Sequence, residues 1–300
     1  MKPITDQILI MSVIIILGYI LRKRGYFSEV VTKDISRLLL SVILPLTIIE
    51  SFMMPYNGEL IVSMLIMAGL MALVTFIFIA LAKVLFKENQ AIEKYATIFT
   101  NKGFIGIPII SALYGKEAIP LVTPMITVGH LFMWTYGLNL LTGEKNKISL
   151  KQIVTNSSFV AMIIGIILFI LPIEYPYFIT KSVSLLTGIN TPMAMLILGV
   201  YLANVSILDT LKEKKSYYVA FIRLIVSPIL VIFMMKWLPL DLLVKQIMIV
   251  LMAVPSASNT AMFAQLTNQD PTYGAQIVSK TTLFSALSLP FIIWLMEIIL

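Results

Sequence analysis

The chain of 300 residues is 59% hydrophobic and only 12% charged, and its mean hydropathy is +0.97. In a soluble domain roughly a quarter of the residues are charged, so this composition excludes a soluble globular protein. Cysteine is absent, which excludes disulfides, thiolate nucleophiles and cysteine-ligated metal sites. The formal net charge of +7 does not indicate nucleic-acid binding, because the basic residues fall in short loops between apolar segments.

Ten apolar segments approach the length that crosses a bilayer, which is about 20 predominantly apolar residues. They lie near residues 6–22, 33–54, 60–83, 92–113, 117–141, 154–172, 178–206, 216–238, 244–266 and 273–298. The sequence therefore predicts an all-α polytopic membrane protein. The seventh segment is long for one span, and Gly188 and Pro192 predict a kink in it.

The basic residues predict the orientation of these segments. One side carries Arg22, Lys23, Arg24, Lys33, Arg37, Lys83, Lys87, Lys94, Lys145, Lys147, Lys151, Lys212, Lys214 and Lys215. The other side carries Lys2, Lys116, Lys181, Lys236 and Lys245. Since cytoplasmic loops are rich in lysine and arginine, we expect a multi-pass protein of the cell membrane with both termini outside.

The ten segments divide into two halves, residues 1–150 and 151–300. Five segments per half is an odd number, so the two halves have opposite orientations in the membrane. Pro45 and Pro192 are 147 residues apart, and so are Pro108 and Pro255. We interpret this spacing as an inverted repeat, which places a substrate near the bilayer midplane.

Two polar, helix-breaking stretches interrupt the fourth and ninth segments, at residues 101–108 and 254–259. Backbone groups freed by such a break must line a cavity or be buried in protein. Each second half-helix should begin near its proline with its positive end at mid-membrane, a favourable place for an anion. The candidate substrate-binding residues are Asn101, Lys102, Gly103, Gly106, Pro108, Pro255, Ser256, Ser258, Asn259 and Lys280.

Lys102 lies near the centre of the fourth segment, where a charged side chain costs about 2.5–3.5 kcal/mol on insertion scales. Its charge could neutralise an anionic substrate; alternatively, it snorkels toward the cytoplasm or pairs with a carbonyl. Lys280 is a candidate for structural pairing as well as for substrate binding. Glu50 is the only acid well inside a segment, which weakens the case for a cation/proton antiporter.

Other polar residues are candidates for ion coupling or gating, namely Glu50, His130, Thr281 and Ser285. His130 either relays protons or is a neutral packing residue. Arg223 is expected to snorkel toward the cytoplasm. Neither a metal-ligand cluster nor a nucleophile–base pair is evident, so we expect no metal, no cofactor and no enzymatic activity.

Several motifs resemble those of the auxin efflux carrier family, over nearly the whole chain and in the same order. They are Leu17 to Gly25, Asn101 to Pro108, Leu198 to Leu202, Ala253 to Pro255 and Thr281 to Pro290. The short central loop from Gly143 to Thr155 is similar to that of the bacterial members.

The resemblance implies ten helices in two inverted five-helix repeats, similar to sodium/bile-acid symporters and sodium–proton antiporters. Spans 1, 2, 6 and 7 would form a scaffold and dimerisation domain, giving a homodimer, and spans 3–5 and 8–10 a mobile transport domain. Spans four and nine would cross at their prolines, with Asn101, Gly106, Pro108, Pro255 and Asn259 at the crossing. The implied mechanism is elevator-like, and the implied substrates are malonate, other carboxylates or auxin-like acids.

The sequence thus favours a secondary active or facilitative transporter of a small organic anion, with a proton or sodium ion as candidate coupling ion. A cation/proton antiporter and a non-transporting membrane receptor on the same scaffold are the alternatives.

Overall fold

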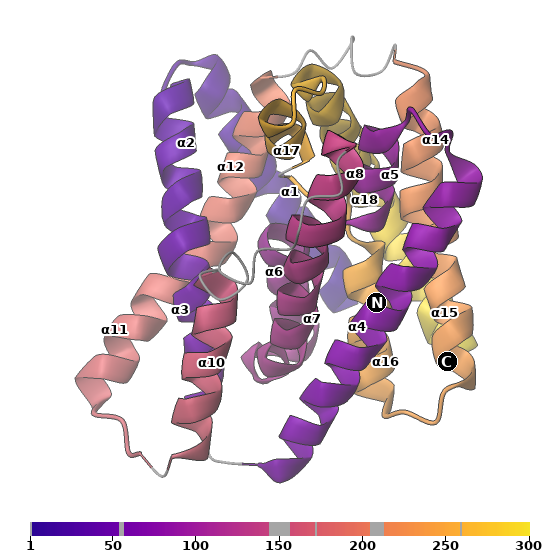
Figure 1. Ribbon diagram of the computed structural model, residues 1–300. Helices are drawn as coiled ribbons and strands as arrows, with labels where there is room; N and C mark the ends of the chain where they lie inside the picture. The colour runs from indigo at the N-terminus through magenta and orange to yellow at the C-terminus, as the bar shows by residue number, and fades with distance from the viewer. Residues whose placement is uncertain (1, 54–56, 144–156, 172, 205–212, 259) are drawn as a thin grey trace.

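A computed structural model describes residues 2–53, 57–143, 157–171, 173–204, 213–258 and 260–300 (Figure 1). The described residues form helices and one isolated antiparallel β-bridge, between Thr100 and Ser256, and contain no β-strand. Helices lie within each of the ten apolar ranges expected from the sequence. The expectation of an all-helical chain is confirmed for this part of the molecule.

The helices of the first half are α1 (Lys2–Lys23), α2 (Glu29–Leu38), η1 (Leu39–Ile43), α3 (Leu44–Ser51), α4 (Gly58–Leu85), α5 (Ala91–Ile98), η2 (Lys102–Gly106), α6 (Ile107–Tyr114), η3 (Lys116–Ala118), α7 (Ile119–Phe132), η4 (Met133–Gly137) and α8 (Leu138–Thr142). Those of the second half are α10 (Ser157–Ile170), α11 (Tyr177–Gly188), α12 (Asn190–Asn204), α14 (Lys215–Phe221), η5 (Ile222–Val226), α15 (Ser227–Trp237), α16 (Leu242–Ala253), α17 (Thr260–Leu266) and α18 (Pro271–Ile299). Elements η1, η2, η4 and η5 are single π-helical turns, and η3 is a 3₁₀ turn.

Four continuous helical stretches are long and apolar enough to cross a membrane. They are Gly58–Leu85, Lys116–Thr142, Lys215–Trp237 and Pro271–Ile299. Large apolar side chains on α4 and α18 face outward; Leu65 is 69% exposed and Leu287 is 79% exposed. Long apolar helices with such outward faces are typical of a protein embedded in lipid.

Polar residues mark where the long apolar helices begin. The Asn57 side chain accepts a hydrogen bond from the Glu59 amide at the start of α4. The Asp270 carboxylate accepts bonds from the amides of Thr272 and Tyr273 at the start of α18. These caps satisfy amides that have no partner within the helix, and so they fix where each helix starts.

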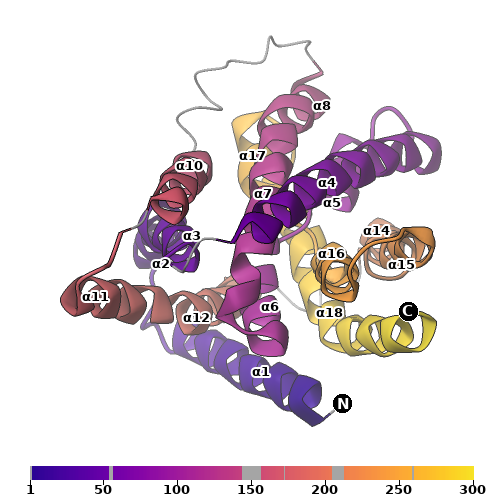
Figure 2. The same ribbon diagram turned by 90° about the horizontal axis from the view of Figure 1, so that it is seen from below.

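The helices form two groups (Figure 2). In the first helix group α1 packs along α12, and α3 packs against α10 and α11. In the second helix group α4 packs against α7, and α18 packs against α14, α16 and α17. Helix α6, which follows the first break, lies between the two groups and contacts α1, α12 and α16.

The seventh apolar segment is bent, as expected. Helix α11 ends at Gly188, and α12 begins at Asn190 after a single intervening residue. The bend follows Gly188, whereas Pro192 lies exposed in the first turn of α12.

Helices α1 and α12 approach until their backbones touch. A Cβ atom on Gly199 would lie 1.9 Å from the Ile15 carbonyl oxygen, and one on Gly18 would lie 2.0 Å from the Leu196 carbonyl oxygen. Small residues at membrane helix crossings permit this close approach.

Gly199→Ala should therefore destabilise the protein by about 1–3 kcal/mol or more, because the methyl group must push the two backbones apart. Thermal unfolding of the purified protein in detergent measures this effect. Gly69→Ala on α4 is the matched control, since a Cβ there meets nothing within 4 Å. Equal unfolding temperatures for the two variants would contradict the close α1–α12 contact.

Candidate functional site

The two predicted helix breaks are present and lie side by side. Helix α5 ends at Ile98 and α16 ends at Ala253, and each is followed by extended backbone. The Asn101 amide donates to the Pro255 carbonyl at 2.9 Å, and the Ala257 amide donates to the Phe99 carbonyl at 3.0 Å. These two bonds form the antiparallel bridge that joins the breaks.

At the bridge, a hydroxyl group from each break donates a hydrogen bond to a carbonyl near the end of the helix that leads into the other break. The Thr100 hydroxyl donates to the Leu251 carbonyl at 3.3 Å, and the Ser256 hydroxyl donates to the Ala96 carbonyl at 2.8 Å. The Ser256 amide in turn donates to the Thr281 hydroxyl oxygen at 3.3 Å. The contacts of Thr100 and Ser256 are reciprocal, so each break stabilises the other.

Arg223 is the central side chain of this arrangement. It lies in η5, is fully buried, and donates from Nη1 to the Thr97 carbonyl at 3.1 Å. Its Nε donates to the Val254 carbonyl at 3.3 Å, and its Nη2 donates to the Met252 carbonyl. One guanidinium therefore pairs carbonyls at the negative ends of both interrupted helices.

The expectation that Arg223 snorkels toward the cytoplasm is wrong. The carbonyl groups freed at the two breaks are strong acceptors with no water to bind them, so burial of the guanidinium among them is favourable. An arginine inside an apolar segment was the signal in the sequence, because intramembrane charges usually serve a function.

Side chains at the first break pack closely against their surroundings. Asn101 donates from Nδ2 to the Ser258 hydroxyl at 2.5 Å and accepts from the Phe104 amide at 3.3 Å. A Cβ on Gly106 would lie 2.5 Å from the Leu251 side chain. Gly103 faces the first helix group, with Leu44 Cδ2 at 3.4 Å from the position of its missing Cβ.

Lys102 begins the second half of its interrupted helix and is 5% exposed. Its Nζ lies 3.4 Å from where a Cβ on Gly129 would be, and the Met71 methyl group lies beside the same point. Within the described residues this ammonium has neither a hydrogen-bond nor an ion-pair partner. Lys102 thus neither snorkels nor pairs with a carbonyl in the described part of the chain.

Lys280 and Thr281 are sequence neighbours that point to different places. Lys280 is fully buried, donates to the Glu213 carbonyl at 2.6 Å and lies 3.5 Å from the ring centre of Tyr217. Lys280 is thus hydrogen-bonded next to the start of α14, whereas Thr281 contacts the second break. Ser285, the other candidate on α18, is buried and donates to the Thr282 carbonyl at 2.6 Å.

Pro108 and Pro255 do not occupy equivalent positions in the two breaks. Their spacing of 147 residues is therefore wrong as an indication of which residues of the two halves correspond. Pro255 lies in the extended backbone of the second break, whereas Pro108 lies in the first turn of α6, after the turn η2. A proline suits both places because its φ is fixed and its missing amide proton costs nothing there.

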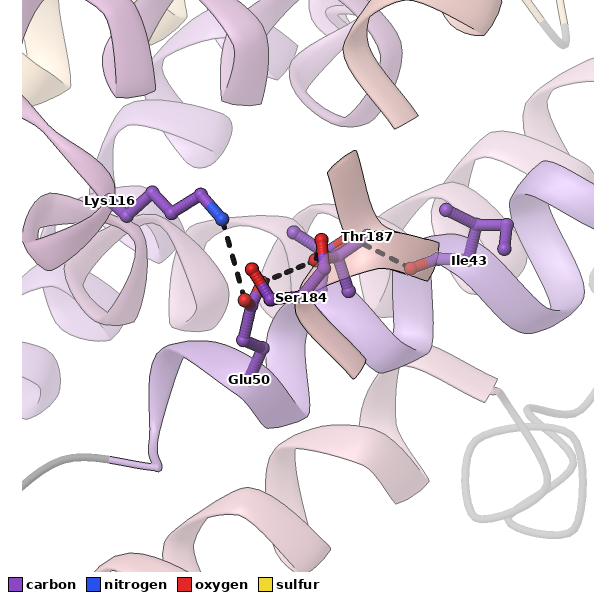
Figure 3. A network of polar contacts seen from close by, with 6 residues as sticks. Ile43, Glu50, Lys116, Ser184 and Thr187 are labelled. Carbon is purple, nitrogen blue, oxygen red and sulfur yellow. Dashed lines mark hydrogen bonds and ion pairs between the residues drawn. The ribbon is translucent and has the colours of Figure 1, made fainter. Parts of the chain in front are cut away.

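Glu50 lies apart from the breaks, in a network that joins the two helix groups (Figure 3). Its carboxylate accepts a hydrogen bond from the Thr187 hydroxyl at 2.5 Å and pairs with Lys116 Nζ at 3.4 Å. A cavity of about 350 Å³ opens beside this network, between α3, η3 and α11, with Tyr177 and Lys181 also in its wall.

The remaining candidates are less informative. His130 is partly buried on α7. Asn259 falls outside the described residues. Those residues hold no group of three or more histidine, cysteine, aspartate or glutamate side chains placed to bind a metal ion.

Replacing Arg223 by methionine should lower the free energy of unfolding by about 3 kcal/mol or more, because three buried carbonyls lose their donors. Thermal unfolding in detergent, followed by size-exclusion profiles, measures this loss. Arg24→Met, at an exposed position after α1, should behave like the wild type. A wild-type unfolding temperature for Arg223→Met would show that the guanidinium does not hold the breaks together.

A family model described as "Membrane transport protein" matches residues 3–155 and 144–293. The chain is 25% identical to an uncharacterized transporter of Methanocaldococcus jannaschii, over 97% of this chain and 98% of the relative. It is 23% identical to an uncharacterized transporter of Methanothermobacter thermautotrophicus, over 95% of this chain and 96% of the relative. The chain therefore belongs to the membrane transport protein family, which is the auxin efflux carrier family indicated by its motifs.

Proposed function

We propose that this membrane transporter carries small organic anions, and that the substrate binds at the two helix breaks. The observation that supports the proposal is Lys102, whose side chain is largely buried, whose ammonium lacks a partner among the described residues, and which begins the half-helix that follows the first break. A buried, unpaired charge is expensive and is usually retained for a function. A carboxylate is the simplest partner for it.

The electrostatics of the break favour an anion over a cation. The carbonyl ends of α5 and α16, which could attract a cation, are already paired by Arg223. Half-helix carbonyl ends are where transporters coordinate sodium, so a fixed guanidinium there leaves less room for a coupling ion. The positive starts of the second half-helices and Lys102 remain available for negative charge.

We further propose ten spans arranged as an inverted repeat, with both termini outside the cell membrane. The antiparallel bridge and the reciprocal hydroxyl contacts of Thr100 and Ser256 support a two-fold relation between the halves. The basic loops support the orientation.

Transport by an elevator-like movement completes the proposal. The first helix group would act as the scaffold, and the second would carry the substrate past it. The Glu50–Lys116 ion pair supports this division, because it crosses from α3 to η3 and must break if the groups slide. An exposed pair of this kind contributes little stability, so breaking it costs little.

Lys102→Gln should lower uptake of a carboxylate substrate at least tenfold while leaving folding intact, because a neutral side chain removes both the substrate partner and a buried charge. The measurement is the uptake of externally added malonate, malate or benzoate into proteoliposomes that contain the protein. Unfolding temperature, measured in parallel, separates lost binding from lost folding.

The matched control for that variant is Lys83→Gln, which removes an exposed charge at the end of α4. Undiminished uptake by Lys102→Gln would contradict the role of Lys102. Absence of uptake of every carboxylate by the wild type would contradict the substrate class.

Linking the two helix groups should stop transport. The chain has no native cysteine, so Glu50→Cys with Lys116→Cys gives a clean pair for a short bis-maleimide linker. We expect uptake to fall to background after linking, with either single variant unaffected by the same reagent. Continued uptake by the fully linked protein would rule out relative movement of the two groups.

A further inference from the structure

Asn190, the first residue of α12, is a buried polar residue that the helix breaks do not explain. It is 2% exposed, and neither Oδ1 nor Nδ2 has a hydrogen-bond partner among the residues that the structure describes. Among the described buried side chains, it alone leaves two polar atoms unpaired. Buried amide groups are nearly always hydrogen-bonded, so a buried side-chain amide with two unsatisfied polar atoms requires an explanation.

The position of Asn190 relates it to the first break. Asn190, Met193 and Ile197 follow the i, i+3, i+7 spacing of one helix face. Met193 and Ile197 pack in the cluster that includes Phe104 of η2. Asn190 therefore lies on the face of α12 that packs against Leu39 and Ile43 of η1 and that also meets Phe104 of the first break.

The surroundings of Asn190 lie between the cavity and the break. Thr187, one turn earlier, is bound to Glu50 beside the cavity, and Phe104 packs against the face one turn later. The α12 helix contacts both η1 and η2, so this face lies where the two helix groups meet.

We infer that Asn190 is a ligand-binding residue on the first helix group, and that it recognises a carboxamide-like end of the transported acid. The inference rests on the proposed function for the anionic end of the ligand. An asparagine side chain offers a donor and an acceptor side by side, and a carboxamide presents the complementary pair. The ligand is thus an acid whose carboxylate binds at the break and whose far end bonds to Asn190.

Two matched acids test this assignment. Succinamate and levulinate have the same charge and nearly the same shape, but levulinate has a methyl group where succinamate has its amide nitrogen. Because an unmade hydrogen bond to a buried amide costs roughly tenfold in binding, we expect the wild type to bind succinamate at least about tenfold more tightly than levulinate. Thermal shift and equilibrium binding on the purified full chain measure the ratio.

The variant Asn190→Leu should abolish that preference, and the ligand-free variant should unfold at a higher temperature than the wild type, because two unpaired buried groups are gone. Asn190→Ala serves as a second variant in case leucine does not fit. Ser227→Ala is the matched control: Ser227 is also fully buried, its hydroxyl lacks a partner among the described residues, and it lies on α15, away from this interface. It should keep the wild-type preference.

Three results would overturn the assignment. They are equal binding of the two acids by the wild type, an unchanged preference in both Asn190 variants, and loss of folding in both. Equal but measurable binding would leave the carboxylate proposal standing. Failure of the wild type to bind either acid would count against both proposals.

Discussion

The interrupted helices are compatible with a membrane only because the carbonyl groups at their ends are paired, and Arg223 is the residue on which that pairing depends. An unpaired carbonyl inside lipid costs several kcal/mol, and each break frees several of them. Arg223 donates to carbonyls from both breaks, and Thr100 and Ser256 donate to two more. The two breaks are thus joined to each other by side-chain and backbone hydrogen bonds.

This arrangement also sets the electrostatics of the site. The guanidinium of Arg223 occupies the carbonyl ends of α5 and α16. The groups that remain to interact with a ligand are Lys102 and the N-terminal ends of the second half-helices, and both carry positive charge. Asn190, on the α12 helix that contacts η2, is neutral. The combination favours a ligand with one negative end and one hydrogen-bonding end.

The sequence predicted the helical segments and the location of both breaks, because glycine, proline and polar residues within apolar runs act locally. It misjudged contacts that depend on the neighbouring helix. The position of Arg223 along its own helix predicts that it reaches the membrane surface, but the carbonyls that it binds come from two other helices. Lys280 is a candidate for substrate binding or structural pairing in the sequence, and only its contacts with the Glu213 carbonyl and the Tyr217 ring, from a neighbouring segment, show which of the two the structure supports. The equivalence of Pro108 and Pro255 failed because proline fits both extended backbone and a first helical turn.

The most direct test of the account is the position of a bound ligand in an experimental structure. A bromine-substituted carboxylate that is transported, soaked into crystals of the full chain, marks its site by anomalous scattering. The account predicts the carboxylate beside Lys102 at the first break, with the far end of the ligand directed toward Asn190. A single site in the cavity beside Tyr177 and Lys181, with none at the break, would contradict it.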